Sequence, residues 1–132
     1  IARDVLTPLA SPGFVREHGP FERPEDLEGL PLLRSRLEPW RTWFAAAGLA
    51  WTEPNEGSQF NDVGLMCDAA AGMGVAPVRL KLAAPWLEQG TLVRLFDIDA
   101  PSPYAHYLCW RAGTMERWEC AAFADWLRRS MA

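Results

Sequence analysis

Short apolar runs alternate with stretches of helical spacing along this chain, and the pattern predicts both strands and helices. Apolar runs predict strands, which we place at 5–10, 30–33, 75–78, 92–96 and 105–110. Helical spacing and capping residues predict helices at 14–17, 24–28, 39–47, 62–73, 79–84 (restarting at Pro85) and from Thr114 to the C-terminal end. This alternation favours an α/β fold with substantial parallel pairing of its strands.

The helix at 62–73 is apolar nearly all round, and Asp68 is its only internal charge. Either Asn61 or Asp62 can cap its N-terminus, and glycines at 72 and 74 end it. A helix of this kind is covered on both sides, by its own core and by a second surface.

Two other helices carry an apolar stripe on one face, which predicts that this face packs into a core. The stripe of the helix at 39–47 consists of Trp40, Trp43, Phe44 and Ala47. The stripe of the final helix consists of Met115, Trp118, Ala122, Phe123, Trp126 and Leu127.

Composition favours a compact acidic unit. The 132 residues are 49% hydrophobic and include seven tryptophans, which is enough apolar bulk for a core. Asp and Glu number 17 against 13 Lys and Arg, whereas surfaces that neutralise nucleic-acid phosphates are basic. Direct DNA binding by this segment is therefore disfavoured. A local basic patch at Arg34, Arg36 and Arg41 is interrupted by Glu38.

The three cysteines, Cys67, Cys109 and Cys120, are odd in number and form no CxxC pair, so neither a disulfide framework nor a zinc site is expected. Their apolar surroundings predict buried, reduced thiols in a cytoplasmic protein. No apolar run approaches 18 residues, so no membrane span is expected. Residues 1–12 lack the pattern of a signal peptide, and the missing initiator methionine suggests a fragment or a processed chain.

Motifs for catalysis are scarce. The chain has no Gly-x-Ser-x-Gly motif, His18 is expected in a solvated loop, and His106 lies in a predicted strand without a partner base or nucleophile. Asp97 and Asp99 lack a third metal ligand nearby. Residues 72–74 follow a helix, the reverse of the dinucleotide-binding order. We therefore expect no catalysis, no metal and no cofactor.

A binding function finds more support. Asn61 and Asp62 stand at a helix N-terminus, where backbone N–H groups can hold an anion or a carboxylate. Plain N-capping explains these two residues at least equally well.

Several motifs share their order and spacing with one known family. The most specific is the run from Ala69 to Ala76, AAAGMGVA. The others are LASP at 9–12, PEDL at 24–27, PLL at 31–33, WRTWF at 40–44, AAG at 46–48, FND at 60–62, Leu87, GTLV at 90–93, Phe96, Tyr107-Leu108, Phe123 and Trp126-Leu127. In this arrangement the chain resembles the effector-binding region of LysR-type transcriptional regulators, in the branch that includes the glycine-cleavage activator and the β-lactamase regulator.

The resemblance implies an α/β fold like the type 2 periplasmic binding proteins, with two lobes between which the chain crosses twice. We expect residues 1–11 to end the first lobe and make the first crossing. Residues 12–100 would form a second, nearly complete Rossmann-like lobe, and residues 101–132 would return to the first lobe. The opening half of that lobe and the winged helix-turn-helix are then absent from this chain.

The resemblance further implies that a small-molecule effector binds in a cleft between the lobes. His106 stands where close relatives often have tyrosine, and Val63 near a position where that branch often has serine, so the effector need not be shared. The basic patch favours an anionic effector, and a solvated charged loop explains it equally well. The cleft positions of the family fall at Ser11, Ser35, Asn61, Asp62 and His106.

In this family the long apolar helix contributes to side-by-side dimerisation, which would supply the second cover for residues 62–73. We expect a homodimer or a higher homo-oligomer that reaches DNA only through the missing N-terminal domain and does not contact a membrane. An incomplete first lobe would leave the apolar faces of the final helix and of the crossing strands uncovered, so the chain is also expected to self-associate.

We interpret the chain as a cytoplasmic, non-catalytic effector-sensing domain, in which an effector shifts the population of lobe arrangements. One alternative is a solute-binding protein of the same fold, and a less favoured one is a small enzyme. A winged helix-turn-helix encoded upstream would support the regulator, and a signal sequence the solute-binding protein. Loss of turnover on mutation of His106 and Asp62 would support the enzyme.

Overall fold

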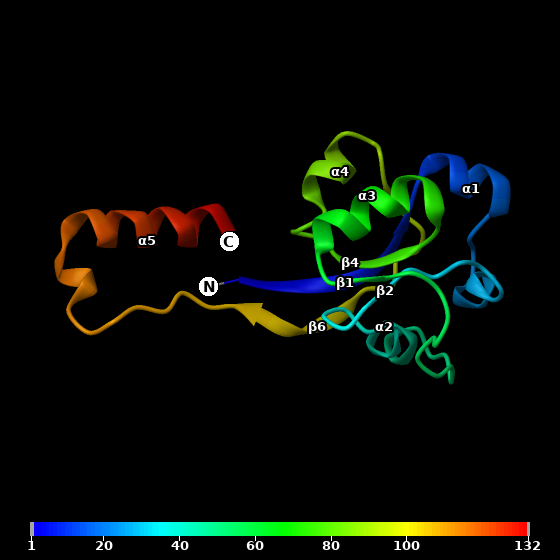
Figure 1. The fold of residues 1–132 in the computed structure, drawn as a ribbon, viewed down its shortest axis with the longest axis horizontal. Coiled ribbons are helices and arrows are strands. Elements are labelled where there is room, and N and C mark those ends of the chain that lie inside the picture. The colour runs from blue at the N-terminus through cyan, green and yellow to red at the C-terminus, as the bar shows by residue number, and fades with distance from the viewer. Residues whose placement is uncertain (1, 132) are drawn as a thin grey trace. The chain divides into compact units, whose positions relative to one another are not determined.

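The computed structural model describes residues 2–131, and the chain divides into two compact units. Unit 1 comprises residues 1–4 and 103–132, and unit 2 comprises residues 5–102. The chain enters unit 2 at Val5 and leaves it after Ser102, and the two passages can be followed by colour in Figure 1.

Helices and strands alternate along the chain, as the sequence pattern predicts. The helical elements are α1 (Pro12–His18), η1 (Pro24–Leu27), α2 (Trp40–Ala46), α3 (Val63–Met73), α4 (Ala84–Glu88), η2 (Thr114–Glu116) and α5 (Trp118–Met131). The strands are β1 (Ala2–Ala10), β2 (Arg34–Ser35), β3 (Gln59–Phe60), β4 (Ala76–Arg79), β5 (Val93–Arg94) and β6 (Ala100–His106). The two elements marked η are short 3-10 helices.

β1 is the central strand of a four-stranded sheet with the order β4-β1-β5, and β6 also pairs with β1. β4 runs antiparallel to β1, with registers from Leu6–Arg79 to Leu9–Ala76. β5 is antiparallel to β1 as well. The prediction of substantial parallel pairing is therefore wrong for the central strand. The strand–helix–strand order sets the direction only of strands joined by a crossover, and β1 pairs with strands far along the chain.

A second, two-stranded sheet is parallel. β2 pairs with β3 in the register Arg34–Gln59 and Ser35–Phe60. An isolated parallel bridge joins Leu32 to Val75 just before β4. The carboxyl ends of β2 and β3 consequently meet at one edge, which is where the clefts described below lie.

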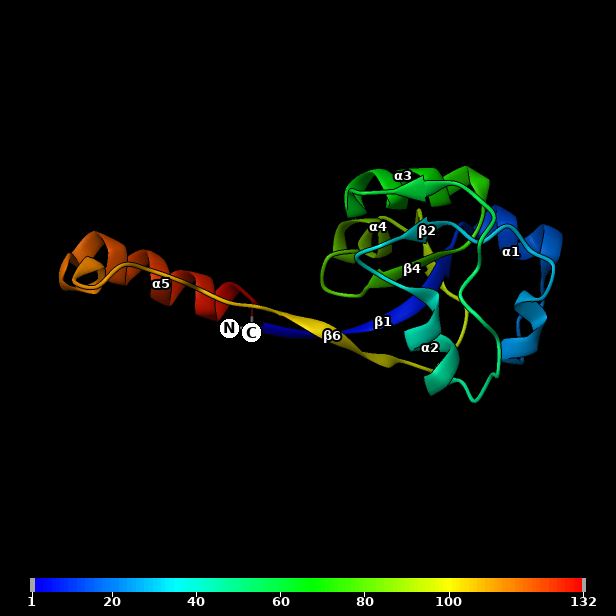
Figure 2. The same cartoon turned by 60° about the horizontal axis from the view of Figure 1, so that its bottom comes forward.

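The core of unit 2 has two clusters of buried side chains, and alternate residues of β1 point into each. Leu6 and Ala10 belong to the first cluster, which includes the aromatic side chains of α2. Leu9 belongs to the second, which includes the buried face of α3. Figures 1 and 2 agree, because both show α3 and α4 on one side of β1 and β4, and α2 on the other.

The apolar stripe of α2 is confirmed. Trp40, Trp43 and Phe44 are fully or almost fully buried, and both indoles find hydrogen-bond acceptors. Trp40 Nε1 donates to the Leu33 carbonyl at 2.7 Å, and Trp43 Nε1 donates to the Ile98 carbonyl at 2.8 Å. A buried indole N–H without an acceptor would lower the stability of the fold, so these two bonds fix the position of α2 in the core.

Several predicted elements are displaced. Residues 30–33 form no strand, although Leu32 makes the isolated bridge to Val75, and the ladder begins at β2. Pro31 lacks a backbone N–H, which weakens any ladder before β2. Residues 80–83 form turns, and the helix begins at Ala84. The strand predicted at 105–110 is observed at Ala100–His106, as β6, and it includes Pro101 and Pro103. A strand tolerates proline wherever the ladder does not need that N–H.

The predicted stripe of the final helix is not buried in this chain. Trp118, Phe123 and Trp126 of α5 are 79%, 58% and 54% exposed. Thr114 does not cap this helix, because it begins η2, and α5 starts at Trp118. The exposure agrees with the expectation that the apolar face of the final helix is uncovered, since no described element covers these rings. Phe123 and Trp126 stack on each other instead, with centroids 5.8 Å apart.

The cysteine prediction is correct for one thiol. Cys67 of α3 is buried, whereas Cys120 is half-buried and Cys109 is exposed, and all three are free. Burial raises the pKa of the Cys67 thiol to about 11, so this thiol stays protonated at neutral pH. Cys109 and Cys120 lie in unit 1, where apolar neighbours in sequence do not form a closed core.

None of the helices in residues 2–131 combines the length and the apolar character needed to cross a membrane.

Candidate functional site

A cleft of about 350 Å³ opens in unit 2 where β2 ends and α2 begins, and we call it the arginine cleft. Its two sides come from residues 34–41 and from the segment 53–59. Three of its eight lining side chains are arginines, which gives it a positive wall. The lining residues are Arg34, Ser35, Arg36, Pro39, Arg41, Glu53, Pro54 and Gln59.

A second cleft, of about 640 Å³, adjoins the first because the two share Arg36 and Gln59. Leu37, Phe60 and Asn61 complete its lining. Both clefts lie at the carboxyl ends of the parallel strands β2 and β3. In open α/β sheets this is the edge at which ligands usually bind.

The three arginines of the cleft are not equivalent. Arg36 and Arg41 are exposed, and among the described residues neither guanidinium makes a hydrogen bond or an ion pair. Both are therefore available to an anionic group, which an arginine can bind through two parallel N–H bonds.

Arg34 has its donors occupied. Its Nε and one terminal nitrogen donate to the Gly57 carbonyl at 3.1 and 2.9 Å, and the other terminal nitrogen donates to the Pro54 carbonyl at 3.4 Å. The guanidinium thus ties β2 to the segment 53–57. Arg34 lines the cleft, but its guanidinium already donates hydrogen bonds to backbone carbonyls.

Glu53 holds the opposite end of the same segment. Its two carboxylate oxygens accept hydrogen bonds from the backbone N–H groups of Trp40, at 2.9 Å, and Arg41, at 2.7 Å. These are the first N–H groups of α2, which Pro39 cannot cap. The sequence offered no signal for Glu53, because a cap from 13 positions downstream is recognisable only in the fold.

Ser35 and Asn61 are brought to adjoining clefts. Ser35 is buried at the wall of the arginine cleft, and its Oγ accepts a hydrogen bond from the Leu37 N–H at 3.2 Å. Asn61 is exposed at the wall of the second cleft. Their proximity follows from the pairing of β2 with β3, because Ser35 lies opposite Phe60, the residue before Asn61.

Ser11 and Asp62 each cap a helix. Ser11 Oγ accepts from the Phe14 N–H of α1 at 3.0 Å, and Asp62 Oδ1 accepts from the Leu65 N–H of α3 at 2.9 Å. Neither residue lines the two clefts. The capping interpretation of Asp62 is thus confirmed. His106, the remaining predicted site residue, is half-buried in β6 and belongs to unit 1.

A buried ion pair that no sequence pattern indicated lies beside the cleft. The Glu38 carboxylate, fully buried just before α2, pairs with Arg79 at the end of β4. The Ser35 carbonyl accepts from the Glu38 N–H at 3.3 Å, so the turn that carries Ser35 also carries this charge. Arg79 in turn stands opposite Leu6 of β1.

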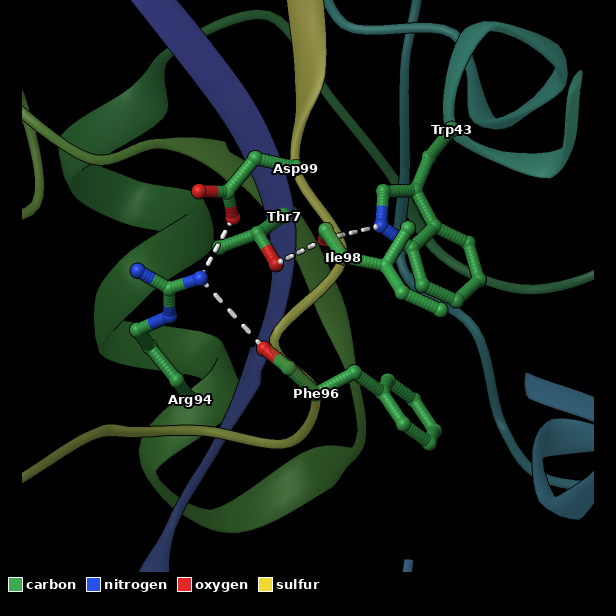
Figure 3. A network of polar contacts seen from close by, with 6 residues as sticks. All are labelled: Thr7, Trp43, Arg94, Phe96, Ile98 and Asp99. Carbon is green, nitrogen blue, oxygen red and sulfur yellow. Dashed lines mark hydrogen bonds and ion pairs between the residues drawn. The ribbon is translucent and has the colours of Figure 1, made fainter. Parts of the chain in front are cut away.

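The segment that connects β5 to β6 is held in place by the polar network shown in Figure 3. The Ile98 carbonyl accepts two hydrogen bonds, from Thr7 Oγ1 at 3.0 Å and from the Trp43 indole. Arg94 forms an ion pair with Asp99, with 2.5 Å between a terminal guanidinium nitrogen and Asp99 Oδ1. The network links β1, α2 and the segment that leads to β6.

Chemistry beyond binding has little support. His18 is exposed, as predicted, although it lies at the end of α1, where its ring is 4.4 Å from that of Phe14. Within residues 2–131, no group of three or more His, Cys, Asp or Glu side chains is placed to hold a metal ion. Asp97 and Asp99 are both exposed, as expected.

An acidic α/β unit with clefts at the carboxyl ends of parallel strands is typical of a ligand-binding domain. Residues 1–132 match the family model of the LysR substrate binding domain, and the chain belongs to that family.

Two relatives are HTH-type transcriptional activators named AmpR. The chain is 31% identical to that of Rhodobacter capsulatus over 129 residues, which cover 96% of this chain and 43% of the relative. It is 38% identical to that of Citrobacter koseri over 101 residues, which cover 75% of this chain and 34% of the relative. The chain therefore spans less than half the length of these relatives.

A solved structure supports the same assignment. The effector domain of the transcriptional regulator AmpR of Pseudomonas aeruginosa superimposes with a TM-score of 0.78 at 29% identity. The match covers 98% of this chain and 63% of that domain. The predicted fold class, α/β and like the type 2 periplasmic binding proteins, is confirmed. The chain thus falls in the family of LysR substrate binding domains, and the relatives named above are transcriptional activators rather than enzymes.

Proposed function

We propose that unit 2 binds an anionic small-molecule effector in the arginine cleft and its adjoining cleft. The observation that carries this proposal is the pair of unoccupied guanidinium groups, Arg36 and Arg41, on one wall. Ser35, Gln59 and Asn61 would add polar contacts for the rest of the effector. A carboxylate or a phosphate group is the chemistry that such a wall recognises best.

In the whole regulator we propose that residues 12–100 form one lobe, and that residues 1–11 and 101–132 belong to the crossings and the other lobe. Ser11, Asp62 and His106 remain proposed effector positions, through the family resemblance alone. DNA binding would fall to the helix-turn-helix domain of the full-length protein, acting in the cytoplasm. An effector that prefers one lobe arrangement would then bias the geometry in which the regulator binds DNA.

We propose that α3 provides a surface for a homodimer. Leu65 and Met73 are 59% and 55% exposed on this helix, while Met66, Cys67 and Ala70 are buried on its inner face. Large exposed apolar side chains on a helix that already has a buried face mark a second covered surface.

A titration with inorganic phosphate tests the anion site. Arg36→Gln and Arg41→Gln would each remove one available guanidinium, and we expect each to weaken binding about two- to fivefold, the effect of an exposed charge contact. Binding is measured from the arginine side-chain NMR signals at low ionic strength. Arg16→Gln, at an exposed position of α1, is the matched control and is expected to bind as the parent chain does. Equal affinity in all four proteins would overturn the proposal.

A further inference from the structure

The segment 53–57 contributes Glu53 and Pro54 to one wall of the arginine cleft, and both of its ends are bound to residues 34–41 on the other side. Glu53 is bound by the first N–H groups of α2, and the Pro54 and Gly57 carbonyls are bound by Arg34. In the sequence Arg34 looks like one more cation of the basic patch. In the structure it is the one arginine of the patch whose donors are occupied.

Other features keep this segment close to β2. Gly57 has φ +103°, a conformation that favours glycine, and a Cβ at this position would lie 2.6 Å from the Leu32 carbonyl oxygen. The Arg34 N–H also donates to the Ser58 carbonyl at 2.9 Å, immediately before β3. The backbone and the guanidinium of Arg34 thus bind the same stretch of chain.

We infer that Arg34 is a positioning residue for effector binding, which clamps the wall 53–57 so that the cleft is formed before the effector arrives. Arg36 and Arg41 contact the anion, whereas Arg34 acts through the backbone carbonyls of Pro54 and Gly57. A wall that is ordered in advance does not lose conformational entropy on binding, so the clamp strengthens affinity without touching the effector. This inference rests on the anion site proposed above.

Arg34→Lys separates positioning from charge. Lysine keeps the positive charge but cannot replace a fork that donates to two carbonyls at once. We expect faster amide hydrogen exchange in residues 53–58 of the free chain, because the clamp is weakened. We also expect phosphate affinity to fall about three- to tenfold, the effect of losing one to two hydrogen bonds. Arg16→Lys is the control and is expected to change neither.

The possible results are distinct. Unchanged exchange in Arg34→Lys would overturn the clamp, whatever the affinity does. Lower affinity with unchanged exchange would show that the Arg34 fork binds the anion itself. Faster exchange with parental affinity would show that the order of the wall does not matter for binding. If the parent chain fails to bind phosphate, the anion site is overturned, while the exchange data still decide whether the clamp exists.

Discussion

Single residues in this chain gain their roles from partners that are distant in sequence. Arg34, Arg36 and Arg41 look alike as a sequence patch, yet Arg34 is bound to backbone carbonyls 20 and 23 positions away. Glu53 completes α2 from outside the helix. Sequence reasoning could locate the patch, because charge and spacing are local properties. It could not show which arginines are available to a ligand and which one holds the cleft wall. That distinction depends on which atoms the fold brings within hydrogen-bond distance.

The buried ion pair of Glu38 leads to a prediction about the stability of the fold. Its carboxylate is fully buried, and Arg79 is its ion-pair partner. Replacing Glu38 by Gln leaves Arg79 as a poorly compensated charge, and breaking a buried pair in this way costs about 3–5 kcal/mol. We expect the free energy of unfolding, measured in urea, to fall by an amount in this range. Glu88→Gln, at an exposed position of α4, serves as the control, and a fall of the same size there would contradict the assignment.

Elements were predicted well where local signals agree with packing. The helices α2 and α3 were found from apolar spacing and from Asp62, because a helix that buries one face repeats that face every three to four residues. The short strands were displaced, because strands of two residues carry too little pattern to locate their ends. The strand β6 spans Ala100–His106 rather than 105–110, and it includes Pro101 and Pro103, a residue type that is unusual inside strands.

The N-terminus of α3 allows a prediction at the scale of an element. Asp62→Ala removes the acceptor of the Leu65 N–H, and we expect a loss of about 0.5–2 kcal/mol in the free energy of unfolding. Asp62→Asn keeps an oxygen that caps equally well, so it is expected to retain nearly all of the stability. Thermal or urea unfolding distinguishes the two. Equal destabilisation by both changes would mean that the charge, and not the cap, is what matters.

At the scale of the whole molecule, nine large hydrophobic side chains of the described residues are exposed. Large exposed side chains occur on α3 of unit 2 and on α5 of unit 1. Since the match covers 63% of a solved effector domain, part of that fold has no counterpart here. The rings of α5 are therefore candidates for contact with other chains.

We predict that the chain self-associates at micromolar concentration, as judged by light scattering. Phe123→Ser and Leu65→Ser each reduce one apolar surface, and each is expected to lower the mean mass of the particles. Ser130→Ala, at an exposed position of α5, is the control and is expected to leave it unchanged. A clean monomer of the parent chain would contradict the prediction. An effect of Leu65→Ser alone would assign association to the proposed dimer surface of α3.

The sequence by itself determined the fold class, the two principal helices and the family, since these depend on periodicity and on the order of motifs along the chain. It also located the basic patch. Only the tertiary structure decided that β1 pairs antiparallel with strands some 70 and 85 positions away. The same holds for Ser35 and Asn61, which line adjoining clefts, and for Arg34, which is a clamp. Hydrogen-bond partners and cleft walls are set by contacts between distant segments, and no local pattern records them.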